Sequence, residues 1–215
     1  MIPKIIHSAW FGGGEKSPLF KRCMAGWRAM LPDWEFREIT EDNLGPALDC
    51  PYIQSVLARR EFVKATELAR LVALEREGGI YLDCDVEVLQ PLTPLRGNQF
   101  FIGRQPDLGL GPHPHKENIN GAVMGSVPGG RVIQYLLSRF PSDGPGEMPA
   151  NHYGPRFLSA CAQVLPAFLG SQWREEYTIF PPEYFYPYAF TQDLSEAVIT
   201  PNTFAIHHWA KSWWK

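Results

Sequence analysis

The stretch GGIYLDCDVEVLQPL, residues 78–92, decides the fold and carries two acidic side chains in an apolar run. Apolar residues take one parity of this run, and polar or acidic residues, Asp83 and Asp85 among them, take the other. The alternation predicts a strand with both aspartates on one side. Two unpaired carboxylates in an apolar strand are costly unless they face water or a cation. The pair is therefore either a solvated strand face or part of a metal site.

The residues before the two glycines predict a helix that leads into this strand. From Ser55 to Glu77 the sequence has no Gly or Pro, and apolar residues recur at helical spacing. Gly78 and Gly79 then form a C-cap pair. A helix that passes through glycines into a buried strand is typical of α/β proteins.

The rest of the chain continues this pattern. Residues 2–10 predict a buried first strand, residues 17–31 an amphipathic helix with Ser17 as N-cap, and residues 33–40 a half-buried strand. Further helices are predicted over 131–140 and over 154–169, the second interrupted by Pro166, and short strands in TIFPPEYFYP, AVITP and TFAIHHW. The Pro/Gly-rich segments 103–118 and 141–155 predict loops.

Size and composition favour one globular domain. The 215 residues are 45% hydrophobic and 20% charged, and a net charge of −3 gives no basic field for nucleic acid. The four cysteines have neither CxxC nor His spacing, which argues against a zinc site or a disulfide framework. No apolar run is long enough to span a membrane, and the first residues do not form a signal peptide, so we expect a cytoplasmic protein. Peripheral association with the inner face of the membrane stays open.

Three groups of residues could carry chemistry. Hard carboxylate oxygens two residues apart suit Mg²⁺ or Mn²⁺, although the spacing alone favours the solvated strand face. Glu67 and Arg70 share one helix face near the aspartates, where the alternative is a surface ion pair of little energetic value. The tail AIHHWAKSWW offers a histidine for a metal and polar groups for a diphosphate, whereas a packed aromatic terminus is favoured for Trp209 and Trp214.

Four segments in this order resemble the DXD-containing sugar transferases of glycosyltransferase family 32, with a more distant likeness to glucosylating toxins. They read IPKIIHSAWFGGGEKS, CMAGWRAMLPDWEFREIT, ATELARLVALEREGGIYLDCDVEVLQPL and AIHHWAKSWW. The combination of Arg70 with GGxYxDxD carries most of the resemblance. It implies a single-domain, Rossmann-like GT-A fold over 1–215, with a mixed central sheet and helices on both faces. Residues 1–100 would be the nucleotide-binding half, and 101–215 would hold the acceptor loops and a metal-binding tail.

The resemblance also implies roles for individual residues. Asp85 would bind Mn²⁺ or Mg²⁺ directly, and Asp83 would contact the ribose or a metal-bound water. His207 would be a further metal ligand, with His208 as the second choice. The candidate catalytic residues are Glu67, Arg70, Asp83 and Asp85, of which the first two would hold the donor sugar.

Other positions would contact the nucleotide-sugar. Trp10 would stack on the base, and Asn120 would contact a sugar or the acceptor. Ser212 and Trp213 would close over the diphosphate. The complete set of expected donor contacts is Trp10, Phe11, Tyr81, Asn120, Lys211, Ser212 and Trp213.

The implied activity is metal-dependent, retaining transfer of a sugar from a UDP- or GDP-linked donor to a glycan or lipid-linked acceptor, in surface polysaccharide synthesis. Two alternatives stay open: a nucleotide-sugar-binding module without turnover, and a haloacid-dehalogenase-type phosphohydrolase, which would need further paired carboxylates after Asp85. One position departs from the family, because Glu67 stands where an aspartate is usual. The extra methylene moves the carboxylate by about 1 Å, and a shift of that size can cost about 10²-fold in rate.

Overall fold

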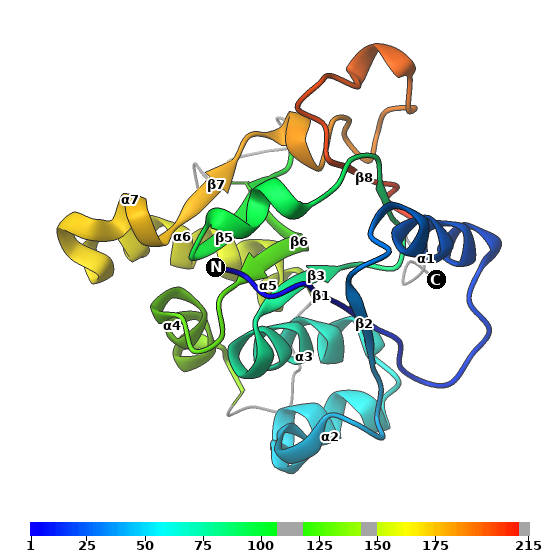
Figure 1. The fold of residues 1–215 in the computed structure, drawn as a ribbon. Coiled ribbons are helices and arrows are strands. Elements are labelled where there is room, and N and C mark those ends of the chain that lie inside the picture. Colours follow the sequence, from blue (N-terminus) through cyan, green and yellow to red (C-terminus); the bar gives the residue numbers. More distant parts are fainter. Residues whose placement is uncertain (107–117, 143–149, 211–215) are drawn as a thin grey trace.

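A computed structural model describes residues 1–106, 118–142 and 150–210. These residues form a six-stranded mixed sheet in the order β2-β1-β3-β6-β5-β7 and a separate two-stranded ribbon, β4-β8 (Figure 1). Strands β1 (Ile5–Ala9), β2 (Glu35–Ile39) and β3 (Gly79–Leu82) are parallel to one another. Strand β6 (Ile119–Ser126) runs antiparallel to both β3 and β5 (Phe100–Arg104), and β7 (Thr178–Phe180) runs parallel to β5.

The first helix, α1 (Pro18–Met30), begins as its sequence predicts. The Ser17 side chain accepts a hydrogen bond from the Phe20 amide at 3.3 Å, and Pro18 occupies the first helical position. Cys23 and Trp27 bury one face of the helix. The Trp27 indole N–H donates to the carbonyl of Val86 at 2.6 Å, so this helix also fixes the residues just after Asp85.

The prediction of one helix over 55–77 is wrong. Helix α2 (Pro51–Ala58) ends at Arg59, and α3 (Phe62–Glu77) starts after a short link. Arg60 in this link has φ 58°, a left-handed conformation that neither Gly nor Pro marks in the sequence. Both helices bury apolar side chains, so tertiary packing rather than helix propensity places the break.

The prediction of one strand through both aspartates is also wrong. Strand β3 ends at Leu82, residues 83–85 form a turn, and β4 (Val86–Val88) leaves the main sheet to pair with β8 (Ala205–His207). The Val86 amide donates to the Asp83 carbonyl at 3.0 Å and closes the turn. The two carboxylates therefore do not form a solvated strand face.

The second half of the chain adds helices and short 3₁₀ segments. The helices are α4 (Arg131–Arg139), α5 (Ala150–Tyr153), α6 (Pro155–Leu169) and α7 (Trp173–Glu176), and the 3₁₀ segments are Gly45–Asp49, Thr93–Gly97, Gly170–Gln172, Pro182–Tyr184 and Glu196–Val198. Helix α6 continues through Pro166, contrary to prediction, because Leu165 and Leu169 on either side are buried. The predicted strand at AVITP is a 3₁₀ turn. Residues 150–153, predicted as loop, are helical, and β5 extends two residues, Gly103 and Arg104, into the predicted loop at 103–118.

Helices cover both faces of the sheet. Helices α3, α4 and α6 pack on one face, and α1 packs on the other together with Val86 and Ala205 of the β4-β8 ribbon. Figure 1 shows α2, α3 and α4 on one side and α1 beside β8. Within the described ranges, no helix has the length and apolar character needed to cross a membrane.

The topology determines where a ligand can bind. The chain adds β2 on one side of β1 and β3 on the other, so the parallel strand order reverses between β1 and β3. Crevices at such a reversal, beyond the carboxyl ends of the strands, are the usual binding sites of open α/β sheets. Trp10 follows β1 and the aspartate turn follows β3, so both lie at this edge.

Candidate functional site

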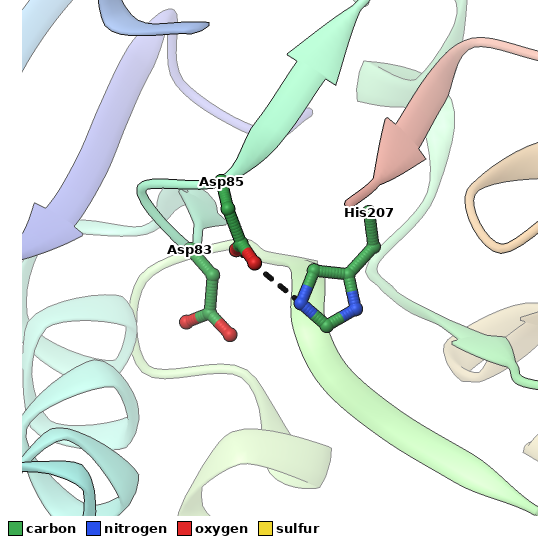
Figure 2. A group of neighbouring side chains, drawn as sticks. All are labelled: Asp83, Asp85 and His207. Atoms are coloured by element: carbon green, nitrogen blue, oxygen red, sulfur yellow. Dashed lines mark ion pairs between the residues drawn. The ribbon is translucent and has the colours of Figure 1, made fainter. Parts of the chain in front are cut away.

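Three side chains from two distant segments meet beyond β3. Asp83, Asp85 and His207 each offer an atom that could ligate a metal, and these atoms lie within 4.8 Å of one another. Figure 2 shows both aspartates on the turn after β3 and His207 on β8, with its imidazole directed toward Asp85. The β4-β8 pairing creates the meeting, since Val86 lies opposite His207 in the ribbon.

Asp85 is buried and held by the C-terminal segment. Its Oδ1 lies 3.3 Å from His207 Nε2, its Oδ2 accepts a hydrogen bond from the Ala210 amide at 2.8 Å, and its carbonyl accepts from the His208 amide. Burial by itself would raise the pKa of Asp85, but the His207 charge and the hydrogen bonds from His207 and Ala210 together lower it. Conversely, burial would lower the pKa of His207, and the Asp85 charge raises it. Each of the two groups therefore favours the charged form of the other.

Asp83 has a more open position and different partners. Its side chain is 31% exposed, and its Oδ1 accepts a hydrogen bond from the Tyr81 hydroxyl at 2.8 Å. The same oxygen lies 3.9 Å from Arg70 Nη1. Asp83 is therefore a partly solvated carboxylate, unlike the buried Asp85.

Arg70 and Glu67 form a buried ion pair beneath Asp83. Arg70 also lies over the Tyr81 ring, 5.1 Å from its centroid, and against Gly121, where any Cβ would come within 2.7 Å of Nη1. Burial raises the pKa of Glu67 to about 7, although the Arg70 charge opposes this change. The pair is not the surface ion pair that the sequence left open.

The Glu67 carboxylate reaches a position that a glycine leaves free. A Cβ on Gly154 would lie 2.6 Å from Glu67 Oε1 and 2.9 Å from its Cδ. The longer side chain of glutamate is thus accommodated by the missing side chain at the start of α6. This contact gives a physical account of the departure from the usual aspartate.

The three candidate ligand residues, Asp83, Asp85 and His207, suit a divalent metal. Two carboxylates favour Mg²⁺ or Mn²⁺, and the imidazole nitrogen favours Mn²⁺ of the two. His207 Nδ1 is buried and lacks a hydrogen-bond partner within the part of the chain that the structure describes. A phosphohydrolase would call for further carboxylates, whereas a histidine joins the aspartates in the described group.

The residues expected to contact the nucleotide-sugar differ in burial and in their partners. Trp10 is half-buried, with its indole N–H donating to the Gly14 carbonyl at 2.7 Å and Lys16 over its ring. Phe11 is buried in the core on the α3 side of the sheet. Asn120 is buried on β6, where its Nδ2 donates to Gln105 at 2.7 Å and its Oδ1 accepts from the Ala122 amide.

His208 is not brought to the three candidate ligands. Its Nε2 lies 2.7 Å from Glu87 Oε2, and this pair accounts for its ring. The structure therefore separates the two histidines that the sequence left as alternatives. Lys211, Ser212 and Trp213 lie outside the described residues.

Sequence reasoning missed Tyr186, which packs against His207 and bonds to the backbone of β6. The Tyr186 hydroxyl donates to the Asn120 carbonyl and accepts from the Val123 amide, both at 3.0 Å. The Tyr186 ring also packs edge-on against His207. The aromatic run EYFYPYAF is the signal that could have indicated it, but the run does not say which ring faces the histidine.

Comparison with known proteins gives the class. Residues 18–102 match the family model described as "Glycosyltransferase sugar-binding region containing DXD motif". The matched part is similar to the DXD-containing region of glycosyltransferases. It includes Glu67, Arg70, Asp83 and Asp85, and it excludes Trp10 and His207. The match supports the predicted class of enzyme, a glycosyltransferase.

A curated relative and several solved structures are similar to most of this chain. Inositol phosphoceramide mannosyltransferase 3 of Schizosaccharomyces pombe is 24% identical over 178 residues, 80% of this chain, and the chain spans 45% of that relative's length. The PaToxG glycosyltransferase aligns with a TM-score of 0.59 at 17% identity, covering 92% of this chain and 82% of that one. The UDP-bound glycosyltransferase domain of the YGT toxin aligns with a TM-score of 0.56 at 11% identity, covering 94% and 82%. The predicted GT-A fold is confirmed.

Proposed function

We propose that this glycosyltransferase moves a sugar from a UDP- or GDP-linked donor to a glycan or lipid-linked acceptor, in a metal-dependent reaction that retains the anomeric configuration. The observation that carries the proposal is the group of Asp83, Asp85 and His207 at the strand-order reversal. A diphosphate bound there would lie at the carboxyl ends of β1 and β3.

The metal, Mn²⁺ or Mg²⁺, would be held by Asp85 and His207, with Asp83 binding it directly or through water. When bound, such an ion stabilises negative charge that develops on a diphosphate leaving group. The chain's own contribution is to keep these ligands in place before the donor arrives.

Arg70 and Glu67 would orient the donor sugar. Arg70 stays protonated beside two carboxylates, and its Nε is buried without a hydrogen-bond partner among the described residues. A buried, unsatisfied donor is costly, so a polar group of the ligand at this nitrogen would remove that cost. Tyr81 would position Asp83, and Asn120 would contact the sugar. Trp10 would stack on the base. Phe11 would support Trp10 from the core. For Lys211, Ser212 and Trp213, the contact with the diphosphate stays a prediction.

The acceptor is proposed as a glycan or lipid-linked glycan in surface polysaccharide synthesis. The name of the fission yeast relative describes mannosyl transfer to a phosphoceramide, which supports a lipid-linked acceptor. The division into a donor half, 1–100, and an acceptor half, 101–215, stays a prediction. So do the cytoplasmic location and contact with the inner face of the membrane.

Nucleotide release tests the function. Purified protein is incubated with UDP- and GDP-sugars in Mn²⁺ or in EDTA, and free nucleotide is measured. We expect release in Mn²⁺ that EDTA abolishes and added Mn²⁺ restores. Metal-dependent nucleotide binding without any release, across a full donor and acceptor panel, would instead identify the chain as a binding module.

A further inference from the structure

Trp209, two residues after His207, has a backbone conformation that needs an explanation. Its φ is 53°, and among the described residues only Arg60 and Trp209 have a positive φ without being glycine. A left-handed conformation is unfavourable for a bulky residue and persists only where surrounding contacts hold it. The contacts around Trp209 include two residues of the candidate metal site, Asp85 and His207.

The first contact is made by the backbone on either side of Trp209. The His208 amide donates to the Asp85 carbonyl at 3.1 Å, and the Ala210 amide donates to Asp85 Oδ2 at 2.8 Å. Two amides that flank one residue thus reach the main chain and the side chain of the same aspartate. The left-handed conformation of Trp209 turns the backbone between the His208 and Ala210 amides.

The second contact is made by the ring. The Trp209 indole lies 4.3 Å from the His207 imidazole, centroid to centroid, and its N–H donates to the Tyr188 carbonyl at 3.0 Å. Tyr186 packs on His207 as well, with centroids 5.8 Å apart, and Tyr186 also contacts the Trp209 ring. The His207 ring is therefore held by two aromatic side chains.

We propose that Trp209 is a positioning residue for the divalent metal: its left-handed turn directs the Ala210 amide to Asp85, while its ring fixes the His207 imidazole. The inference rests on the proposed metal site. It assigns a role to a residue that the sequence placed in a packed aromatic terminus. Groups that orient metal ligands through hydrogen bonds and packing tune metal affinity strongly, by about 10–100-fold.

The test measures Mn²⁺ affinity by calorimetry on the full chain, without donor or acceptor. Trp209→Val removes the ring and introduces a β-branched residue that disfavours positive φ, so we expect Mn²⁺ affinity to fall by about tenfold or more. Trp209→Asn tolerates the left-handed turn but lacks the ring and should lose less. Trp209→Phe keeps an aromatic contact with His207 and should recover most of the affinity.

Arg60→Val is the matched control. It places the same residue at the other left-handed position, in the link between α2 and α3, and should lower the unfolding temperature without changing Mn²⁺ affinity. Unchanged Mn²⁺ affinity in Trp209→Val, with wild type binding Mn²⁺, would overturn the positioning role alone. An equal loss in Arg60→Val would overturn it too, because the effect would then be general destabilisation. Absence of Mn²⁺ binding in wild type would overturn the metal site and the positioning role together.

Discussion

Asp83 and Asp85 are two residues apart, yet different regions of the molecule hold them. Asp83 contacts Tyr81 and Arg70, which belong to the same continuous α3-β3 segment. Asp85 contacts His207 and Ala210, and its bond to the Ala210 amide spans 125 residues of sequence. We call the first group the donor side and the second the tail side. The donor side joins residues that are close in sequence, whereas the tail side needs β8 to pair with β4.

Substitutions on the two sides should therefore have separable effects. The donor side is built on a buried ion pair, so the loss of that pair should affect stability more than it affects metal binding. The tail side supplies two of the candidate ligands, so its loss should mainly affect metal binding.

The largest expected effect is on the donor side. Arg70→Met should lower the free energy of unfolding by about 3 kcal/mol or more, because it leaves Glu67 buried without its partner. Chemical denaturation at pH 7 measures this change. The double variant Glu67→Gln with Arg70→Met should regain part of the loss, since replacing both charges removes the unpaired carboxylate. A double variant at least as unstable as the sum of the two single ones would contradict the pairing.

The same pair predicts a pH dependence. The pKa of Glu67 is raised by burial to about 7, above its ordinary value of 4.5, so the folded state binds a proton more tightly than the unfolded state does. Stability contributed by this group therefore falls as pH rises from 4.5 through 7. Arg70→Met removes the charge that opposes the rise, so the fall should continue to higher pH in that variant. Unfolding free energies from pH 5 to 8 test this, and Glu67→Gln should flatten the profile.

On the tail side, His207→Ala should weaken Mn²⁺ binding by more than about 100-fold, since even outer partners of a metal site are worth about 10–100-fold. Its effect on unfolding should be smaller than that of Arg70→Met. Mn²⁺ titration and then thermal unfolding of each variant measure its metal affinity and its stability on the same sample. If His207→Ala unfolds as readily as Arg70→Met yet binds Mn²⁺ normally, the division into two sides is wrong.

Gly154 tests how the donor side accommodates Glu67. Gly154→Ala should cost about 1–3 kcal/mol of unfolding free energy, because its Cβ would overlap the Glu67 carboxylate. In a Glu67→Asp background the shorter side chain leaves space, so the cost of Gly154→Ala should shrink. Equal costs in both backgrounds would rule out the contact as the reason that glutamate is tolerated.

The smallest effect is expected at His208. Its partner Glu87 is partly exposed, and the pair lies apart from the three ligands, so His208→Ala should change stability by about 1 kcal/mol at most. Mn²⁺ affinity should be unchanged, which makes this variant the control for His207→Ala. A comparable loss of Mn²⁺ affinity in both would mean that the structure assigns the wrong histidine.

The donor side was largely predictable from sequence, and the tail side was not. The spacing of Glu67 and Arg70 places them on one helix face, and two glycines lead directly into β3, because these are local relations. Whether β4 continues β3 or leaves it depends on pairing with β8, more than 100 residues later, and alternation in GGIYLDCDVEVLQPL cannot encode that choice. For the same reason His207 entered through family resemblance, and Tyr186 and Ala210 were missed.

Two errors in secondary structure have the same physical origin. The break at Arg60 and the continuation of α6 through Pro166 are both set by which side chains the tertiary core buries. Local signals indicated the opposite in each case, since no Gly or Pro marks the break and a proline does mark the continuous helix.

The central claim is that Asp85 binds a divalent ion that holds a nucleotide diphosphate. Calorimetric titration of UDP and GDP into wild type and Asp85→Ala, each in Mn²⁺ and in EDTA, tests it most directly. We predict nucleotide binding by wild type in Mn²⁺ only, and none by Asp85→Ala in either condition, with the variant still folded by circular dichroism. Equal nucleotide affinity of the two proteins in Mn²⁺ would contradict the account.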